Sequence, residues 1–185
     1  MNLMDKKVVA FSLSLLPMMI SSGMFYSVLS LYISEELKAN KMQIGMLFTI
    51  GALTGVLTSI LLGKAADKFG KKPLVILSQV LFAIVMLSYS LINYYIYALP
   101  IHVVEGFAWA MLGSSAPALI ADIAKKGHRG EAMGIYNTVW NLGWVIGPFL
   151  GGSLAEFFGF RTMLLASFLM ITFGIVLSSY VLSNE

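Results

Sequence analysis

Residues 63–73 read G-K-A-A-D-K-F-G-K-K-P, and this short charged stretch decides how the sequence around it folds. It lies between two long apolar runs and carries four lysines and one aspartate. Its two glycines and its proline disfavour a long helix. We therefore expect a tight turn that reverses the chain at a membrane surface.

The composition indicates a membrane protein. Of the 185 residues, 58% are hydrophobic and 11% are charged, whereas a soluble domain has about 25% charged residues. The net charge of +3 comes from lysines in the expected loops, so we predict no nucleic-acid partner. The absence of cysteine excludes disulfide bonds.

Six apolar runs are long enough for spanning helices, which need about 20 residues each. We expect an all-α membrane protein in which residues 1–185 form a single six-helix bundle within the lipid bilayer. The predicted helices cover residues 8–33, 43–62, 73–93, 95–122, 132–157 and 161–182.

The basic residues predict the orientation of this bundle. Of the twelve lysines and arginines, only Lys38, Lys41 and Arg161 fall on one predicted side, and the other nine fall on the opposite side. Positive residues favour the cytoplasmic face. We therefore expect a multi-pass plasma-membrane protein with both termini and the turn at residues 63–73 in the cytoplasm.

An internal repeat relates the two halves of the sequence. The pattern G-x-x-A-D-x-F-G-x-K begins at Gly63, and G-x-x-A-E-x-F-G-x-R begins at Gly152, 89 residues later. The same offset pairs Gly45 with Gly134 and Thr49 with Thr138. The repeat unit holds three predicted spans, so its second copy is inverted, an arrangement typical of transporters. The alternative is that glycine, acidic and basic residues in this order suit any turn at a membrane surface, so that the two patterns are alike without an internal repeat.

Three motifs resemble the Major Facilitator Superfamily. The first, G-x-x-x-D-x-x-G-K-K, covers residues 63–72 and is similar to the family's cytoplasmic signature between spans 2 and 3. The second, G-x-x-x-G-P-x-x-G-G, covers residues 143–152 and resembles the span-5 signature of the proton-coupled exporters. The third comprises Asp122, Arg129, Gly130 and Gly134, and it is similar to loop 4–5 of the drug/proton antiporters.

The resemblance implies a secondary transporter that exports small or amphipathic solutes in exchange for protons by alternating access. Family members have twelve or more spans in two halves, so this chain resembles an N-terminal half. The implied partner is a second six-helix half, either a C-terminal half or a second copy of the chain. A uniporter or symporter for a small metabolite and a non-transporting membrane subunit are the alternatives.

The resemblance also implies a cytoplasmic gate, because the Asp of the first signature is associated with closing that face. Lys71 or Lys72 is within reach of Asp122, and Asp67 is suited to cap a helix N-terminus. The alternative is a solvated turn whose lysines only set the topology. The predicted gate comprises Gly63, Asp67, Gly70, Lys71, Lys72, Asp122 and Arg129.

In the fifth predicted span, glycines recur every four residues and predict close helix packing. Such stripes let helix backbones approach in lipid, and Pro148 removes one backbone hydrogen bond. The alternative is that these glycines form a fixed packing contact between two helices that does not change during transport. The predicted packing residues are Gly143, Gly147, Pro148, Gly151 and Gly152.

Glu105 is the one acidic residue deep inside a predicted span. A charge in the bilayer costs several kcal/mol, so such residues usually serve a function. His102 lies three residues earlier on the same helix face. The pair replaces the Arg and Gln usual in this family, and we predict that Glu105, assisted by His102, carries the coupling proton. The alternative is a structural hydrogen bond.

Polar and aromatic residues in the first and fifth spans predict a substrate path along Tyr26, Asn137, Asn141 and Trp144. The same residues are equally suited to hold helices together. No Ser/His/Asp set, zinc motif or phosphate loop appears in the sequence. We therefore expect no enzymatic activity, no catalytic residue, no metal and no cofactor.

Overall fold

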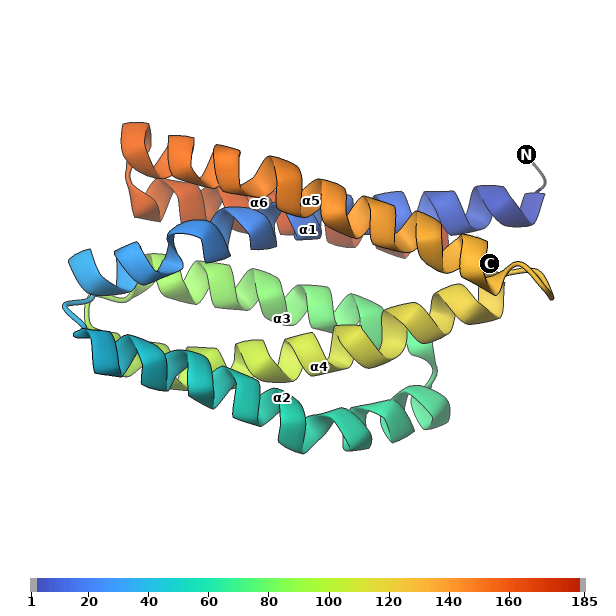
Figure 1. Ribbon diagram of the computed structural model, residues 1–185, viewed down its shortest axis with the longest axis horizontal. Helices are drawn as coiled ribbons and strands as arrows, with labels where there is room; N and C mark the ends of the chain where they lie inside the picture. Colours follow the sequence, from blue (N-terminus) through green and yellow to red (C-terminus); the bar gives the residue numbers. More distant parts are fainter. Residues whose placement is uncertain (1–2, 184–185) are drawn as a thin grey trace.

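The computed structural model describes residues 3–183 and contains six long α-helices (Figure 1). No strand occurs within these residues, which confirms the predicted all-α class. The helices are α1 (Leu3–Glu35), α2 (Lys41–Phe69), α3 (Lys71–Leu91), α4 (Ala98–Ile123), α5 (Arg129–Phe158) and α6 (Phe160–Ser183), and a short 3₁₀ helix, η1 (Tyr95–Tyr97), precedes α4.

Five of these helices are long and apolar enough to cross a membrane, namely α1, α2, α3, α4 with η1, and α6. Helix α5 does not meet the same criterion of length and composition because glycines, asparagines and tryptophans interrupt its apolar residues. It is 30 residues long, however, and it runs beside α1 through the depth of the bundle (Figure 1).

The turn after α2 is much shorter than residues 63–73. Helix α2 continues to Phe69 and α3 begins at Lys71, so only Gly70 lies between them. Alanine and lysine in residues 64–68 are good helix formers and outweigh the single Gly63. Pro73 lies in the first turn of α3, where the missing N–H has no helical partner to lose. Our prediction of an eleven-residue turn was therefore wrong in its extent.

The helix contacts show a two-fold relation between the first three helices and the last three. Helix α1 packs along α5 as α4 packs along α2, and α3 packs on α4 as α6 packs on α1. In Figure 1, α1 and α4 run in opposite directions. Exchanging the two triplets therefore reproduces the same contacts in inverted orientation.

Local geometry repeats along with the sequence. Gly70 and Gly159 end α2 and α5 with nearly the same left-handed conformation, at φ/ψ of 93°/150° and 83°/159°. A side chain at either position would strain the backbone. The hydroxyls of Thr49 and Thr138 each donate to the carbonyl four residues earlier, both at 2.9 Å.

Glycines allow α1 to pack closely against α5, and α4 to pack closely against α2. A Cβ added to Gly23 of α1 would lie 2.9 Å from the carbonyl oxygen of Gly143 and 3.1 Å from the Cα of Gly147 on α5. A Cβ added to Gly106 of α4 would overlap the carbonyl of Gly51 on α2. Both contacts are therefore possible only because these positions lack side chains.

All residues of the predicted glycine motif of α5 except the last one contact α1. Gly143, Gly147 and Gly151 are buried against the backbone of α1, and Pro148 lies beside Gly23. By contrast, a Cβ on Gly152 would meet no atom within 4 Å. Gly152 thus takes no part in the contact between α1 and α5.

Candidate functional site

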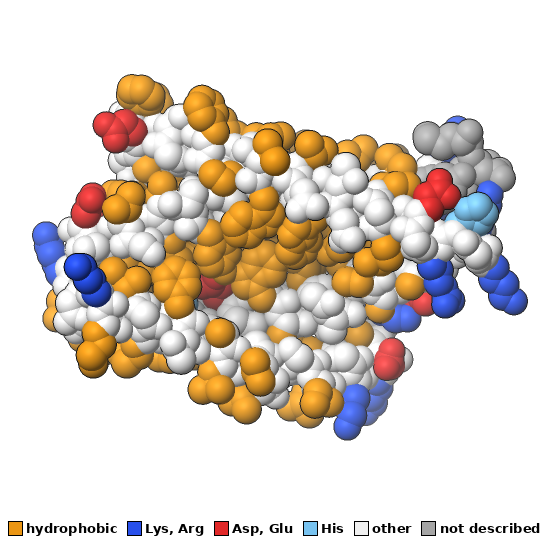
Figure 2. All heavy atoms as spheres, viewed as in Figure 1, with side chains coloured by type: hydrophobic (Ala, Val, Ile, Leu, Met, Phe, Trp, Pro, Cys, Tyr) orange, Lys and Arg blue, Asp and Glu red, His pale blue; other side chains and the backbone are white. Residues whose placement is uncertain are grey.

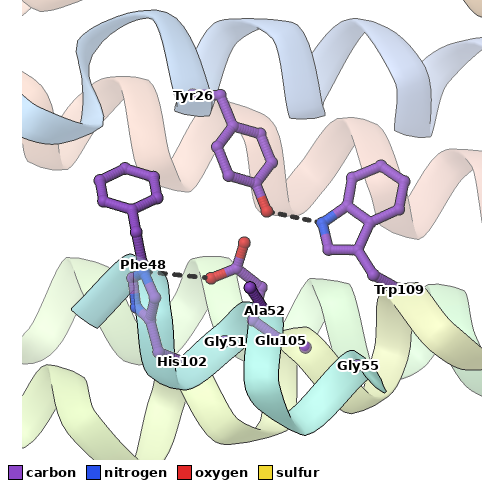
Figure 3. Close-up of a pocket in the computed structure, with 9 residues that line it drawn as sticks. Tyr26, Phe48, Gly51, Ala52, Gly55, His102, Glu105 and Trp109 are labelled. Atoms are coloured by element: carbon purple, nitrogen blue, oxygen red, sulfur yellow. Dashed lines mark hydrogen bonds and ion pairs between the residues drawn. The ribbon is translucent and has the colours of Figure 1, made fainter. Parts of the chain in front are cut away.

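A pocket of about 310 Å³ opens between α1, α2 and α4 (Figure 3). Figure 2 shows the corresponding face of the bundle hollowed at its middle, with hydrophobic side chains around the hollow and an acidic side chain deep inside it. The pocket is lined by Tyr26, Phe48, Gly51, Ala52, Gly55, His102, Glu105, Gly106 and Trp109.

Glu105 lies at the floor of this pocket with only 3% of its surface exposed. The close approach of Gly106 to Gly51 holds α4 against α2 and encloses the carboxyl group on that side. Its Oε2 atom has no hydrogen-bond partner among residues 3–183. Burying a polar group without a hydrogen bond is costly, so the described residues leave this atom in an unfavourable state.

His102 lies beside Glu105 as the spacing predicted. Its Nε2 atom is 3.6 Å from Oε2 of Glu105, which is beyond a direct hydrogen bond. Its other ring nitrogen, Nδ1, is hydrogen-bonded to the hydroxyl of Tyr89 on α3. Phe48 of α2 approaches the imidazole ring edge-on, with 5.7 Å between the ring centroids. The imidazole is therefore held from one side and faces the carboxyl group on the other.

Aromatic side chains form the opposite wall of the pocket. The Nε1–H of Trp109 donates a 2.6 Å hydrogen bond to the Tyr26 hydroxyl, which links α4 to α1. Figure 3 shows this pair across the pocket from α2, with the Glu105 carboxyl group pointing toward Tyr26. Trp144 of α5 stacks on Tyr26, with 5.9 Å between the ring centroids, and extends the aromatic surface.

The four predicted path residues do not all reach this pocket. Tyr26 lines it and Trp144 lies directly behind Tyr26. Asn137 and Asn141 instead lie on the exposed side of α5 and make no hydrogen bond through their side chains to the described part of the chain. The two asparagines are therefore not among the residues that line the pocket around Glu105.

Three residues of the site were missed by sequence reasoning. Trp109 follows Glu105 by one helical turn, and that spacing was a usable signal. Phe48 and Tyr89 belong to other helices, and nothing in the sequence connects them with His102. Their roles depend entirely on how α2 and α3 pack against α4.

A second cluster lies at the end of the bundle where α2 meets α3. The Nζ atom of Lys71 forms an ion pair with Oδ2 of Asp122 and so joins the start of α3 to the end of α4. Lys72 donates a 3.2 Å hydrogen bond to the carbonyl oxygen of Leu182 near the end of α6. A hollow of about 410 Å³ beside this ion pair is also lined by Asp67 and Gly70.

The other predicted gate residues make fewer contacts. Asp67 is exposed and does not cap α3, because the N-cap residue is Gly70 and no side chain accepts a capping hydrogen bond there. The suggested capping role was therefore wrong. A Cβ on Gly63 would meet no atom within 4 Å. Arg129 begins α5 and has no ion pair with any residue in the described range.

Within the part of the chain that the structure describes, no group of three His, Asp or Glu side chains is arranged to bind a metal ion. The chemistry of the pocket therefore depends on one carboxyl group, one imidazole and the aromatic hydroxyl and indole groups around them. These groups can bind and release protons or contact a solute with an apolar, aromatic surface.

Comparison with known proteins gives the family. The sequence model of the Major Facilitator Superfamily matches residues 11–185. The chain is 29% identical over 161 residues to an uncharacterized MFS-type transporter of Methanocaldococcus jannaschii, covering 87% of this chain and 42% of that protein.

Two further relatives carry names that refer to drug resistance, and one of them is named as an efflux pump. The multi-drug resistance efflux pump PmrA of Streptococcus pneumoniae is 33% identical over 129 residues, which cover 69% of this chain and 32% of the pump. The quinolone resistance protein NorA of Staphylococcus aureus is 25% identical over 153 residues, which cover 83% of this chain and 39% of NorA. The chain thus spans less than half the length of these relatives, and it belongs to the Major Facilitator Superfamily of membrane transporters.

Proposed function

We propose that this chain forms the N-terminal half of a proton-coupled exporter of small or amphipathic solutes. The observation that supports the proposal best is the buried carboxyl group of Glu105, which faces a pocket and has an oxygen without a hydrogen-bond partner among residues 3–183. The name of the relative PmrA, a multi-drug resistance efflux pump, supports efflux as the direction of transport.

Glu105 is suited to carry a proton because its surroundings change the cost of its charge. Inside the closed pocket, a proton on the carboxyl group removes a buried charge that apolar neighbours cannot stabilise. When the helices separate and water enters, water solvates the carboxylate, the free-energy cost of its charge falls, and the proton can leave. Proton transfer is thereby coupled to the alternation between two conformations.

The pocket also suits an amphipathic solute. Tyr26, Phe48 and Trp109 present aromatic faces and edges, while the Tyr26 hydroxyl and the Glu105 carboxyl group supply polar contacts. A solute held by aromatic surface requires little exact hydrogen-bond geometry, so one pocket can accept several related molecules. In a full transporter, the second half would close the exposed side of this pocket.

The ion pair between Lys71 and Asp122 is our candidate for a gate at the cytoplasmic face. It joins α3 to α4, and it forms only while these helix ends are close. Figure 1 places the start of α1, the α2–α3 turn, the α4–α5 connection and the end of α6 at this same end. By the positive-inside rule we place this end in the cytoplasm of a plasma-membrane protein.

The orientation has a direct test because the chain contains no cysteine. A membrane-impermeant thiol reagent applied to intact cells should label Lys38→Cys and leave Lys64→Cys unlabelled. Opening the cells should make Lys64→Cys reactive. Labelling of Lys64→Cys in intact cells would reverse the proposed orientation.

The proton role is tested by Glu105→Gln in the assembled transporter, with ethidium as an amphipathic aromatic probe. We expect that an imposed pH gradient no longer drives ethidium transport in everted vesicles, because the amide cannot bind and release a proton. Glu105→Asp should retain part of this activity, and the exposed Glu35→Gln is the matched control. Full pH-driven transport by Glu105→Gln would overturn the proposal.

The same assay separates the alternatives. Transport that does not depend on the pH gradient in the parent protein would favour a uniporter. Proton and solute movement in the same direction would favour a symporter. If the assembled parent protein moved neither protons nor any probe, a non-transporting subunit would be favoured instead.

A further inference from the structure

The His102 ring has a hydrogen-bond partner on another helix. Tyr89 of α3 is completely buried, and its hydroxyl is hydrogen-bonded to Nδ1 of His102. No other hydrogen bond of this hydroxyl occurs in residues 3–183. The Tyr89 hydroxyl and the His102 imidazole therefore depend on each other inside the bundle.

Helix α1 fixes the position of Tyr89. The hydroxyl of Tyr32 donates a 2.5 Å hydrogen bond to the backbone carbonyl of Tyr89. The ring of Phe25 also packs against the Tyr89 ring, with 5.2 Å between the centroids. Because α1 holds both the backbone and the ring of Tyr89, the hydroxyl has little freedom to move away from His102.

The two neutral tautomers of His102 satisfy these contacts unequally. If Nδ1 carried the proton, it would donate to the Tyr89 oxygen, the Tyr89 proton would have no acceptor, and the Nε2 lone pair would face a carboxyl oxygen. If Nε2 carries the proton, Tyr89 donates to Nδ1 and the Nε2–H faces Oε2 of Glu105 at 3.6 Å. In the second arrangement the Tyr89 proton has an acceptor and the Nε2–H points at a carboxyl oxygen, although these two atoms are too far apart for a direct hydrogen bond.

We infer that Tyr89 is a positioning residue that fixes His102 in its Nε2–H tautomer and so directs a hydrogen-bond donor at Glu105. The titratable neighbours of the ring are Glu105 on α4 itself, Tyr89 on α3 and, through the Tyr89 backbone, Tyr32 on α1. Helix α2 contributes the uncharged edge of Phe48.

This inference refines the proposed function and, for its consequence in transport, rests on it. With Nε2 already protonated, His102 cannot accept the Glu105 proton through the nitrogen that faces it. His102 then acts as a donor that stabilises the carboxylate, and the transported proton resides on Glu105 alone. A shuttle between the two side chains would require the hydrogen bond to Tyr89 to change.

The tautomer can be measured directly because the chain contains only two histidines. We would label the full chain with ¹⁵N-histidine, reconstitute it in lipid bilayers and assign the protonated ring nitrogen of each histidine by solid-state NMR. The measurement is made at about pH 8, where an ordinary imidazole is neutral. Exposed His128 serves as the internal reference.

We expect a single Nε2–H form for His102 in the parent chain and a mixture of both tautomers in Tyr89→Phe. Tyr136→Phe is the matched control, since it removes the same atom from a buried ring on α5 whose ring contact is with Trp140 and not with Tyr89 or His102. It should retain the single form, and His128 should not change in either variant.

An Nδ1–H form of His102 in the parent chain would overturn the inference even if Tyr89→Phe failed to fold. An unchanged Nε2–H form in a folded Tyr89→Phe variant would overturn it too, as would the same change in Tyr136→Phe. The NMR result does not depend on transport. Full activity of Glu105→Gln would therefore end the proton proposal and leave the role of Tyr89 intact.

Discussion

The contact between α1 and α5 and the contact between α2 and α4 are two versions of one arrangement with different chemistry. Gly23 of α1 faces two glycines of α5, and Gly106 of α4 faces two glycines of α2. One residue before each central glycine, however, the first contact has Ser22 and the second has Glu105.

The difference lies in how these two buried residues are satisfied. The Ser22 hydroxyl donates a 2.9 Å hydrogen bond to the carbonyl of Met18, so its proton has an acceptor within α1. The Glu105 carboxyl group has an oxygen without a partner among the described residues. The contact between α1 and α5 is therefore a packing contact in which the buried Ser22 side chain is hydrogen-bonded. The other contact has the same close glycine packing but also buries a carboxyl oxygen that has no hydrogen-bond partner among the described residues, and this is why we propose a function for Glu105.

The largest expected effect is loss of the close contact between α2 and α4. In Gly106→Leu, the side chain would overlap the Gly51 backbone, which cannot move without separating the helices. We expect a loss of stability of about 3 kcal/mol or more, seen as a lower melting temperature in detergent and little folded protein.

Gly113→Leu is the control for this substitution, because Gly113 lies on the same helix with no atom within 4 Å of an added Cβ. It should melt close to the parent protein. If Gly106→Leu melted like Gly113→Leu, the two helices would not be in the close contact described.

Glu105→Met should stabilise the chain and abolish pH-driven transport. Replacing a buried, incompletely satisfied carboxyl group by an apolar side chain of similar length removes a penalty of about 1–3 kcal/mol. We expect a higher melting temperature together with loss of the response to a pH gradient, a trade-off typical of functional residues. A lower melting temperature would show that the Glu105 carboxyl group supports the structure.

Ser22→Ala should have a smaller effect of the opposite sign. It removes one side-chain hydrogen bond within α1, which contributes about 0.5–1.5 kcal/mol, and leaves the glycine contact with α5 unchanged. The melting temperature should fall slightly and pH-driven transport should persist. Loss of pH-driven transport in a folded Ser22→Ala variant would contradict the contrast between the two contacts.

The smallest effect is expected at the ion pair between Lys71 and Asp122. Both side chains are partly exposed, at 23% and 55% of their surface, so the pair should contribute about 0.2–1 kcal/mol to stability. A double-mutant cycle with Lys71→Ala and Asp122→Ala measures this coupling energy, and high salt should reduce it. A coupling energy that did not change with salt would contradict an exposed ion pair.

Glu105 and His102 were predictable because local information was enough. A carboxylate inside an apolar run is visible in the sequence, and a spacing of three places two side chains on one helix face. The turn at residues 63–73 was predicted over too many residues, because helix continuation through Gly63 depends on several neighbours together. Asn137 and Asn141 do not line the pocket, although Trp144 on the same face of α5 stacks on Tyr26. Which residues of one helix face reach a pocket depends on packing, and periodicity does not specify it.

The sequence by itself determined the all-helical class, the internal repeat and the acidic residue inside the fourth helix, because these follow from hydropathy, spacing and the cost of charge in lipid. Only the tertiary structure decided that Tyr89 bonds His102, that Trp109 bonds Tyr26 and that Phe48 covers the imidazole. Each of these contacts joins different helices. Their geometry depends on how closely the glycine contacts let the helix backbones approach, and that distance is set by packing in three dimensions.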